Sequence, residues 1–269
     1  MKIYISVDME GIAGVTHGDH VKLEGSEYEK ARKWMTWEAN AAIKGALEAG
    51  ASEVVVADSH GHMRNLVLDE LHEDAVVIQG SPRPLGMMAG IDNTFAAACF
   101  IGYHSRAGDR AGVLAHSFTG QVYNLRLNGT TVGEGGFNAA IAGHFGVPLA
   151  FTAGDDTIDA EIASLLPSTK RVIVKWAINT TAAHSLTPKG AQKAIQSGIK
   201  TALTNLGDIQ PFVIDRPIRL EVDLMRPLSA FSAQDIPGVE QIDDRTLAYT
   251  GADMMEINRI LRLIFNVGR

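Results

Sequence analysis

An alternation of short apolar runs with a long helical pattern organises the first hundred residues of the chain. Residues 2–6 form a strand-like run, residues 28–49 repeat apolar and small side chains at helical spacing, and residues 53–57 form a β-branched run. Further apolar runs cover residues 75–78 and 94–102. Strand, helix and strand in this order predict parallel pairing through a crossover helix. The sequence therefore predicts an α/β fold, a three-layer sandwich built on a mostly parallel sheet.

The pattern changes in the last third of the chain. Residues 218–224 alternate apolar and polar side chains like a half-exposed strand, residues 247–249 form another strand-like run, and residues 253–265 form an amphipathic helix. These features are typical of a small α+β unit. We therefore expect residues 1–184 to form the larger α/β domain and residues 185–269 to form a smaller α+β domain.

Composition excludes two classes of partner. The chain has 24 Lys and Arg against 31 Asp and Glu, a formal net charge of -7, and no basic run. Proteins that bind nucleic acid neutralise phosphates with Lys and Arg, so we expect no nucleic-acid partner. No apolar run approaches the ~20 residues that span a membrane, and no signal-peptide pattern precedes the first strand. Cys99, the single cysteine, cannot form an internal disulfide. We expect a cytoplasmic protein without membrane contact.

Asp8 and Glu10 form a carboxylate pair directly after the first strand-like run. Side chains at positions i and i+2 of a strand point to the same side, so the two can present oxygen atoms to one small volume. Two like charges held this close need a cation or a shared proton. Gly11 then lets the backbone turn away without strain. The pentapeptide alone leaves open the alternative of a strand end whose acids are solvated.

Further candidate metal ligands come from other segments. His60 and His104 follow the second and fourth strand-like runs, and Glu134 lies in a glycine-rich stretch that leads into a helix. Loops converge outside the carboxyl ends of strands in open α/β sheets, so we expect Asp8, Glu10 and the two histidines at one edge. Imidazole and carboxylate are usual zinc ligands in hydrolytic sites, and two ions ~3.5–4 Å apart can activate water. The set is typical of a two-metal hydrolase, provided that the fold brings it together.

Six short motifs carry a more specific signal. They are Ser6-Val-Asp-Met-Glu-Gly-Ile12, Ala57-Asp-Ser-His60, Phe100-Ile-Gly-Tyr-His104, Ala115-His-Ser117, Val132-Gly-Glu134 and Ala153-Gly-Asp-Asp156. In this order and at this spacing, the chain resembles the D-aminopeptidases of the DppA type, a family of zinc metallopeptidases. The resemblance spans nearly the whole chain.

The resemblance implies a site and an activity. The implied zinc ligands, for two Zn²⁺ per subunit, are Asp8, Glu10, His60, His104 and Glu134. Asp8 would bridge the ions, and His116 would be the catalytic histidine. The implied activity is that of a hydrolase, an aminopeptidase that removes the N-terminal residue from short peptides, with preference for D-residues. The family also implies a ring-shaped homo-oligomer, a decamer. All the implied ligands lie in residues 1–184, which we therefore expect to be the metal-binding catalytic domain.

The role of His116 and the choice of substrate stay open at this point. The family's histidine is called a nucleophile in some descriptions, but a metal-activated water with a pKa near ~7 is a better nucleophile. We therefore expect His116 to act as a general acid/base or to stabilise the oxyanion. Asp155 or Asp58 is a candidate for holding the ammonium group of the substrate. Hydrolysis of L-peptides, or of another amide or ester, is an alternative, as is a non-catalytic peptide-binding or transport-accessory protein.

The remaining polar residues have simpler explanations. We expect His62 beside the site and not in it, and Asp156 as the cap of a helix. The glycines around Glu134 lack the Lys-Ser/Thr of a phosphate-binding loop and would let this carboxylate approach the metals. Five other histidines are expected to be solvated or to cap helices. They are His17, His20, His72, His144 and His184.

Overall fold

The computed structural model describes residues 1–267, and its larger sheet confirms the α/β prediction. This sheet has seven strands in the order β3-β2-β1-β4-β7-β8-β9, and every pairing except that of β8 with β9 is parallel. The strands are β1 (Lys2–Val7), β2 (Glu53–Asp58), β3 (Ala75–Ile78), β4 (Ala97–Tyr103), β7 (Leu149–Asp155), β8 (Lys170–Asn179) and β9 (Ala182–Ser185). β1 thus lies inside the sheet, between β2 and β4.

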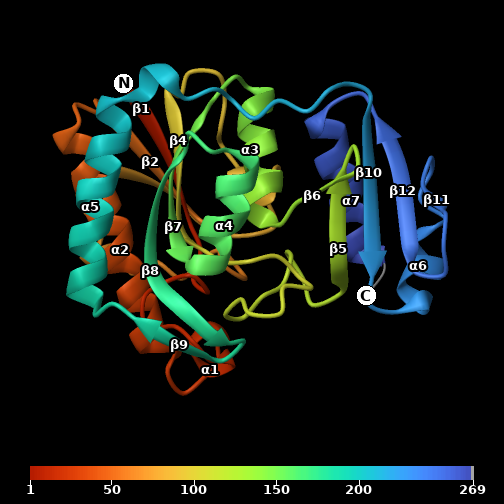
Figure 1. The fold of residues 1–269 in the computed structure, drawn as a ribbon, viewed down its shortest axis with the longest axis horizontal. Coiled ribbons are helices and arrows are strands. Elements are labelled where there is room, and N and C mark those ends of the chain that lie inside the picture. The colour runs from red at the N-terminus through yellow and green to blue at the C-terminus, as the bar shows by residue number, and fades with distance from the viewer. Residues whose placement is uncertain (268–269) are drawn as a thin grey trace.

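Helices cover both faces of this sheet, which makes the expected three layers (Figure 1). α2 (Tyr28–Glu48) and α5 (Pro188–Thr204) pack side by side on one face. α3 (Glu134–His144) and α4 (Asp156–Leu165) lie on the other face. The short helices are α1 (Gly18–Val21), η1 (Leu68–Glu70), η2 (Gly86–Met88) and η3 (Leu206–Asp208). None of the helices within residues 1–267 combines the length and apolar character needed to cross a bilayer.

Both faces of β1 are buried, and alternate residues pack in different cores. Ile3, Ile5 and Val7 belong to the core under α2 and α5. Tyr4 belongs to the core on the α3 side, and Ser6 is buried with it. Burial of each large apolar side chain stabilises the fold by roughly 1.5–3 kcal/mol. The strand is therefore held firmly up to the point where the carboxylate pair begins.

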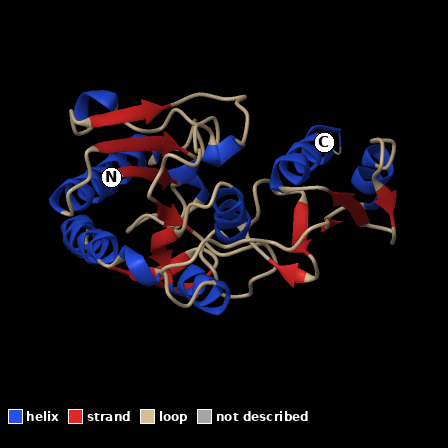
Figure 2. Ribbon diagram, turned by 90° about the horizontal axis from the view of Figure 1, so that it is seen from above, coloured by secondary structure: helices blue, strands red, loops and turns tan. Residues whose placement is uncertain are grey.

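A second, antiparallel sheet of five strands stands beside the first (Figure 2). Its strands, in sheet order, are β11 (Glu240–Gln241), β12 (Thr246–Gly251), β10 (Ile218–Leu224), β5 (Val122–Leu127) and β6 (Thr130–Thr131). α6 (Pro227–Ala233) and α7 (Met254–Val267) accompany it. Leu125, Leu220 and Leu247 from its strands share one core with Phe137 of α3 and Leu261 of α7. The two sheets are thus joined through a common apolar interior.

The two sheets do not divide the chain at residues 184 and 185. β5 and β6 form a hairpin through Asn128 and Gly129, whose φ angles of 48° and 81° suit a tight hairpin turn. β5 pairs with β10, so this hairpin belongs to the smaller sheet. α5 packs against α2 and the larger sheet, although it follows residue 185. The spatial arrangement differs from the expected division because the chain passes from one sheet to the other more than once. Independent folding of residues 1–184 stays a prediction.

Candidate metal centre

The predicted ligands meet at the carboxyl edge of the larger sheet. Asp8 and Glu10 follow β1, His60 follows β2, and His104 follows β4. These three strands are neighbours in the sheet, so their ends lie side by side. Glu134 is the first residue of α3 and projects from the covering layer. All five side chains are buried.

A close backbone approach brings the loop after β1 against the end of β4. Gly11 N donates a hydrogen bond to Gly102 O at 2.7 Å. A Cβ atom at Gly11 would lie 1.9 Å from the carbonyl oxygen of Tyr103, which leaves no space for any other residue. Gly102 has a φ of 69°, in the region that favours glycine. The two glycines therefore set how near the carboxylate pair comes to His104.

His60 faces both members of the carboxylate pair. Its Nδ1 lies 2.9 Å from Glu10 Oε2 and 3.3 Å from Asp8 Oδ1. Its Nε2 lies 2.8 Å from the carbonyl oxygen of Val21. A carbonyl only accepts, so Nε2 carries a proton, and Nδ1 of the neutral ring turns a lone pair toward two carboxylates. A cation, either a proton or a metal ion, is needed between these atoms.

His104 repeats this arrangement on the other side of Asp8. Its Nε2 lies 3.5 Å from Asp8 Oδ2 and 3.5 Å from Glu134 Oε1. Its Nδ1 lies 2.9 Å from the carbonyl oxygen of Ser105, to which it donates. Nε2 is buried and has no hydrogen-bond partner among the described residues. The two oxygens of Asp8 therefore serve two different imidazoles.

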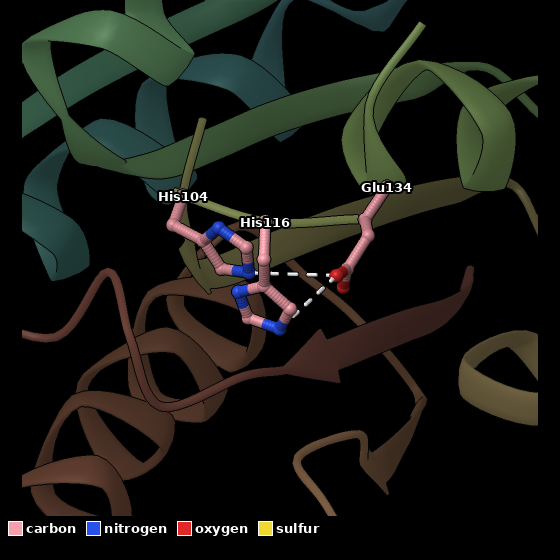
Figure 3. A group of neighbouring side chains, drawn as sticks. All are labelled: His104, His116 and Glu134. Carbon is pink, nitrogen blue, oxygen red and sulfur yellow. Dashed lines mark ion pairs between the residues drawn. The ribbon is translucent and has the colours of Figure 1, made fainter. Parts of the chain in front are cut away.

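His116 reaches the same carboxylate from a more open position. Its Nε2 lies 3.7 Å from Glu134 Oε1, and 31% of its side chain is exposed. Figure 3 shows its ring beside that of His104, and the two are stacked with centroids 4.4 Å apart. His116 Nδ1 donates to the carbonyl oxygen of Leu114 at 2.9 Å. Leu114 N in turn donates to Thr180 O, so the turn between β8 and β9 supports this loop.

Burial and mutual charge shift the acid–base properties of the cluster. Burial, with Glu10 as the next contribution, raises the pKa of Asp8 to about 8. Burial also opposes ionisation of Glu10, but the facing His60 holds the pKa of Glu10 well below its usual value. Burial disfavours the charged form of His104, yet Glu134 outweighs it and raises the pKa of His104 to about 10. Without a metal the cluster keeps protons, and protons compete with metal ions for the same atoms.

A cavity of about 160 Å³ opens onto the cluster. Its lining includes Asp8, Glu10, Glu134, Met63, Met87 and Phe118. His60 and His116 also reach this space, whereas His104 lies behind it. Within residues 1–267, the acidic groups that line the cavity are the three carboxylates already described. The site therefore combines a concentrated negative charge with a small, partly apolar entrance.

Asp58 and Asp155, the candidates for an ammonium site, are not available to a substrate. Both are fully buried, and neither lines the cavity. Asp58 accepts a hydrogen bond from Leu66 N at 2.7 Å. Asp155 accepts from Ile158 N at 2.9 Å and from Val113 N at 3.1 Å. Asp58 stabilises a loop, and Asp155 stabilises a loop and the start of α4, so neither meets the expectation.

The N-cap of α4 is Asp155, one residue before the expected Asp156. The Asp156 carboxylate instead accepts a hydrogen bond from Ala177 N at 2.9 Å. The expectation was wrong because two adjacent carboxylates give the same sequence signal for a cap. The backbone conformation decides between them.

Lys175 is a functional neighbour of the site that the sequence interpretation missed. Its side chain, from β8, is fully buried. Its Nζ donates to the carbonyl oxygens of Glu10, Ile12 and Val15. Burial lowers the pKa of Lys175 to about 8. A lysine within an apolar strand-like run is unusual, and this was the signal available in the sequence.

Comparison with known proteins places this site in a family. The sequence profile of a family described as D-aminopeptidase matches residues 1–263. The chain belongs to the D-aminopeptidase family. A D-aminopeptidase of Bacillus subtilis (strain 168) is 38% identical to it over 258 residues, which cover 95% of this chain and 93% of that protein.

A solved D-aminopeptidase has the same fold. It is the Zn-dependent D-aminopeptidase DppA from Bacillus subtilis, described as a self-compartmentalizing protease. The TM-score is 0.97 at 34% sequence identity, and the match covers 100% of this chain and 98% of that one. The family resemblance, the fold class and the expected class of enzyme, a metallo-aminopeptidase, are confirmed.

Proposed function

We propose that this D-aminopeptidase is a binuclear zinc enzyme that removes the N-terminal residue from short peptides, with preference for D-residues. One observation carries the proposal: the two oxygens of Asp8 lie 3.3 Å and 3.5 Å from two different imidazole nitrogens, those of His60 and His104. A carboxylate in this position can bridge two cations. Glu10 stands beside the first imidazole and Glu134 beside the second.

The donor set fits zinc. Imidazole nitrogens and carboxylate oxygens are its usual ligands in catalytic sites, and thiolates are not required. In each histidine, one ring nitrogen donates to a backbone carbonyl, which fixes the ring and leaves the other nitrogen for a metal. His60, Glu10 and one oxygen of Asp8 would hold one ion. His104, Glu134 and the other oxygen of Asp8 would hold the second.

His116 is suited to move a proton during hydrolysis. Zinc, when bound, supplies the Lewis acid that polarises the peptide carbonyl and activates water. His116 Nδ1 is committed to the Leu114 carbonyl, so Nε2 is the atom that can accept and return a proton. Glu134 Oε1 lies 3.7 Å from this nitrogen, so His116 stands beside the proposed second ion. The partial exposure of the ring lets a bound peptide reach it.

The small size of the cavity favours the end of a short peptide. Its three carboxylates, Asp8, Glu10 and Glu134, are all assigned to the proposed ions, so their charge does not select an ammonium group. A volume of about 160 Å³ accommodates the end of a chain and not its middle. The cavity therefore supports exopeptidase over endopeptidase activity.

We further propose that the protein works in the cytoplasm as a ring-shaped homo-oligomer, a decamer. The solved relative is described as self-compartmentalizing, a description that implies enclosure by copies of one chain. The single cysteine, Cys99, is buried and unpaired, which suits a reducing compartment. Size measurement of the purified protein by light scattering tests the assembly.

Amino-acid release from D-Ala-D-Ala and L-Ala-L-Ala by the zinc-loaded protein tests the activity, with a chelator as the control. We expect chelator-sensitive release from the D-peptide alone. Release from the L-peptide alone would keep the chemistry and refute the substrate preference. Zinc binding without release from either peptide would refute the enzyme assignment and favour a peptide-binding protein.

A further inference from the structure

Four polar side chains form a continuous hydrogen-bond network in the core directly beneath the metal centre. Ser6 Oγ lies 2.7 Å from Ser59 Oγ and 2.8 Å from the hydroxyl oxygen of Tyr103. Asn138 Nδ2 donates to the same tyrosine oxygen at 3.0 Å. All four side chains are buried, with exposed fractions of 0–4%. Ser59 also borders the cavity at the metal centre, whereas Ser6, Tyr103 and Asn138 do not line it.

Each member of this network is a close sequence neighbour of a proposed zinc ligand. Ser6 precedes Asp8 by two residues on β1, and Ser59 directly precedes His60. Tyr103 directly precedes His104 at the end of β4. Asn138 lies one helical turn after Glu134 on α3. The network therefore connects the four segments that carry all five proposed ligands.

The two strand neighbours of β1 are already held by backbone pairing, but α3 belongs to another layer. The hydrogen bond from Asn138 to the Tyr103 hydroxyl links that layer to β4. The same hydroxyl is hydrogen-bonded to Ser6, which links β4 to β1. Hydroxyl groups buried in a medium of low dielectric must keep their partners, which makes such a network rigid. Movement of one ligand segment away from the others would break buried hydrogen bonds of this network.

We propose that Ser6, Ser59, Tyr103 and Asn138 are positioning residues that set the spacing of the zinc ligands. The inference rests on the proposed zinc site. Tyr103 is the centre of the network because its hydroxyl group contacts both Ser6 and Asn138. None of the hydrogen bonds of this network goes to a proposed ligand side chain, so their effect on zinc would be transmitted through the backbone.

Tyr103→Phe tests the role of the hydroxyl group with little change in packing. The ring of Tyr103 stacks on Phe100 with centroids 4.4 Å apart, and phenylalanine keeps this contact. Tyr4→Phe is the matched control. Tyr4 is equally buried on the same side of the sheet, and its hydroxyl donates to the carbonyl oxygens of Met87 and Ala89. The Met87 carbonyl also accepts from Ser6 and Ser59, and these bonds remain in Tyr4→Phe, so the control loses buried hydrogen bonds without parting two ligand segments.

The zinc affinity of each metal-free protein is measured by competition with a chelating dye, alongside its melting temperature. We expect Tyr103→Phe to bind zinc roughly 10–100-fold more weakly, in line with the loss of other outer-sphere partners. We expect Tyr4→Phe to keep wild-type affinity although it melts at a lower temperature. The visible spectrum of the cobalt-substituted protein, which reports ligand geometry, should change in Tyr103→Phe and not in the control.

Ser6→Ala removes a different member of the network and keeps the test decisive if Tyr103→Phe does not fold. It should also weaken zinc binding. Wild-type zinc affinity in both network variants, or an equal loss in the Tyr4→Phe control, would overturn the inference alone. A wild-type protein that binds no zinc would overturn the proposed function and this inference together.

Discussion

Replacement of His116 by alanine separates catalysis from metal binding. The side chain is 31% exposed, and its removal costs one hydrogen bond to Leu114 and the stacking on His104. We therefore expect a loss of about 1 kcal/mol or less in unfolding free energy. Loss of a positioned acid–base group lowers kcat roughly 10²–10⁴-fold. This factor corresponds to about 3–5 kcal/mol of activation free energy, far more than the structural cost.

The assay follows D-alanine release from D-Ala-D-Ala and measures zinc per subunit in the same preparation. We expect zinc content to stay at the wild-type value, and added imidazole to restore part of the rate in His116→Ala. His62→Ala is a matched control, because His62 follows the same strand as His60 but does not line the cavity. The control should keep the wild-type rate.

The competing role for His116 is that of a metal ligand. His104, His116 and Glu134 offer three atoms that lie within 4.8 Å of one another, a separation that one ion could bridge. If His116→Ala lost zinc while its fold persisted, the acid–base role would be refuted and His116 would be a ligand. An unchanged kcat would refute both roles.

Two further predictions concern pH and metal removal. Burial raises the pKa of Glu38 to about 7, above its usual 4.5, so only the folded state holds this proton between these values. The contribution of Glu38 to the unfolding free energy of the metal-free protein should therefore fall by about 3 kcal/mol as pH rises from 4.5 to 7. Glu38→Gln, which keeps an acceptor for Ala13 N, should flatten that part of the profile in urea unfolding, and an unaltered profile would contradict the reasoning. Removal of zinc by a chelator should lower the melting temperature reversibly, because Asp8, Glu10 and Glu134 lose their counter-cation; calorimetry that finds equal melting temperatures would count against the site.

The sequence predicted the edge of the sheet at which the candidate site lies. Each of four proposed ligands follows a strand-like run: Asp8, Glu10, His60 and His104. A parallel sheet brings such positions to one edge, and this does not depend on the conformation of the loops. Hydrophobic periodicity was sufficient for this step, because β1, β2 and β4 are buried on both faces. The smaller sheet was predicted in part, since β10 alternates cleanly between buried and half-buried residues.

Other features of the site and fold could not be predicted, because they depend on side-chain directions and long-range contacts. Asp58 and Asp155 are the last residues of β2 and β7 and lie at strand ends as Asp8 does, yet their carboxylates turn inward to backbone amides. The local sequence does not distinguish these two directions. Lys175 could not be connected to Glu10 from the sequence, because the contact joins residues 165 positions apart. α5 was assigned to the second domain because only packing against α2 reveals its true layer.

The position of Lys175 has a consequence for the time at which the proposed metal site can form. The loop that carries Glu10 is made on the ribosome before β8, which brings the ammonium group that holds its carbonyls. α3, with Glu134, is also made long after β1. Domains generally fold as units once their chain has emerged. The first carboxylates therefore emerge before the framework that gathers them, and the proposed metal site would form only after β8 has been made.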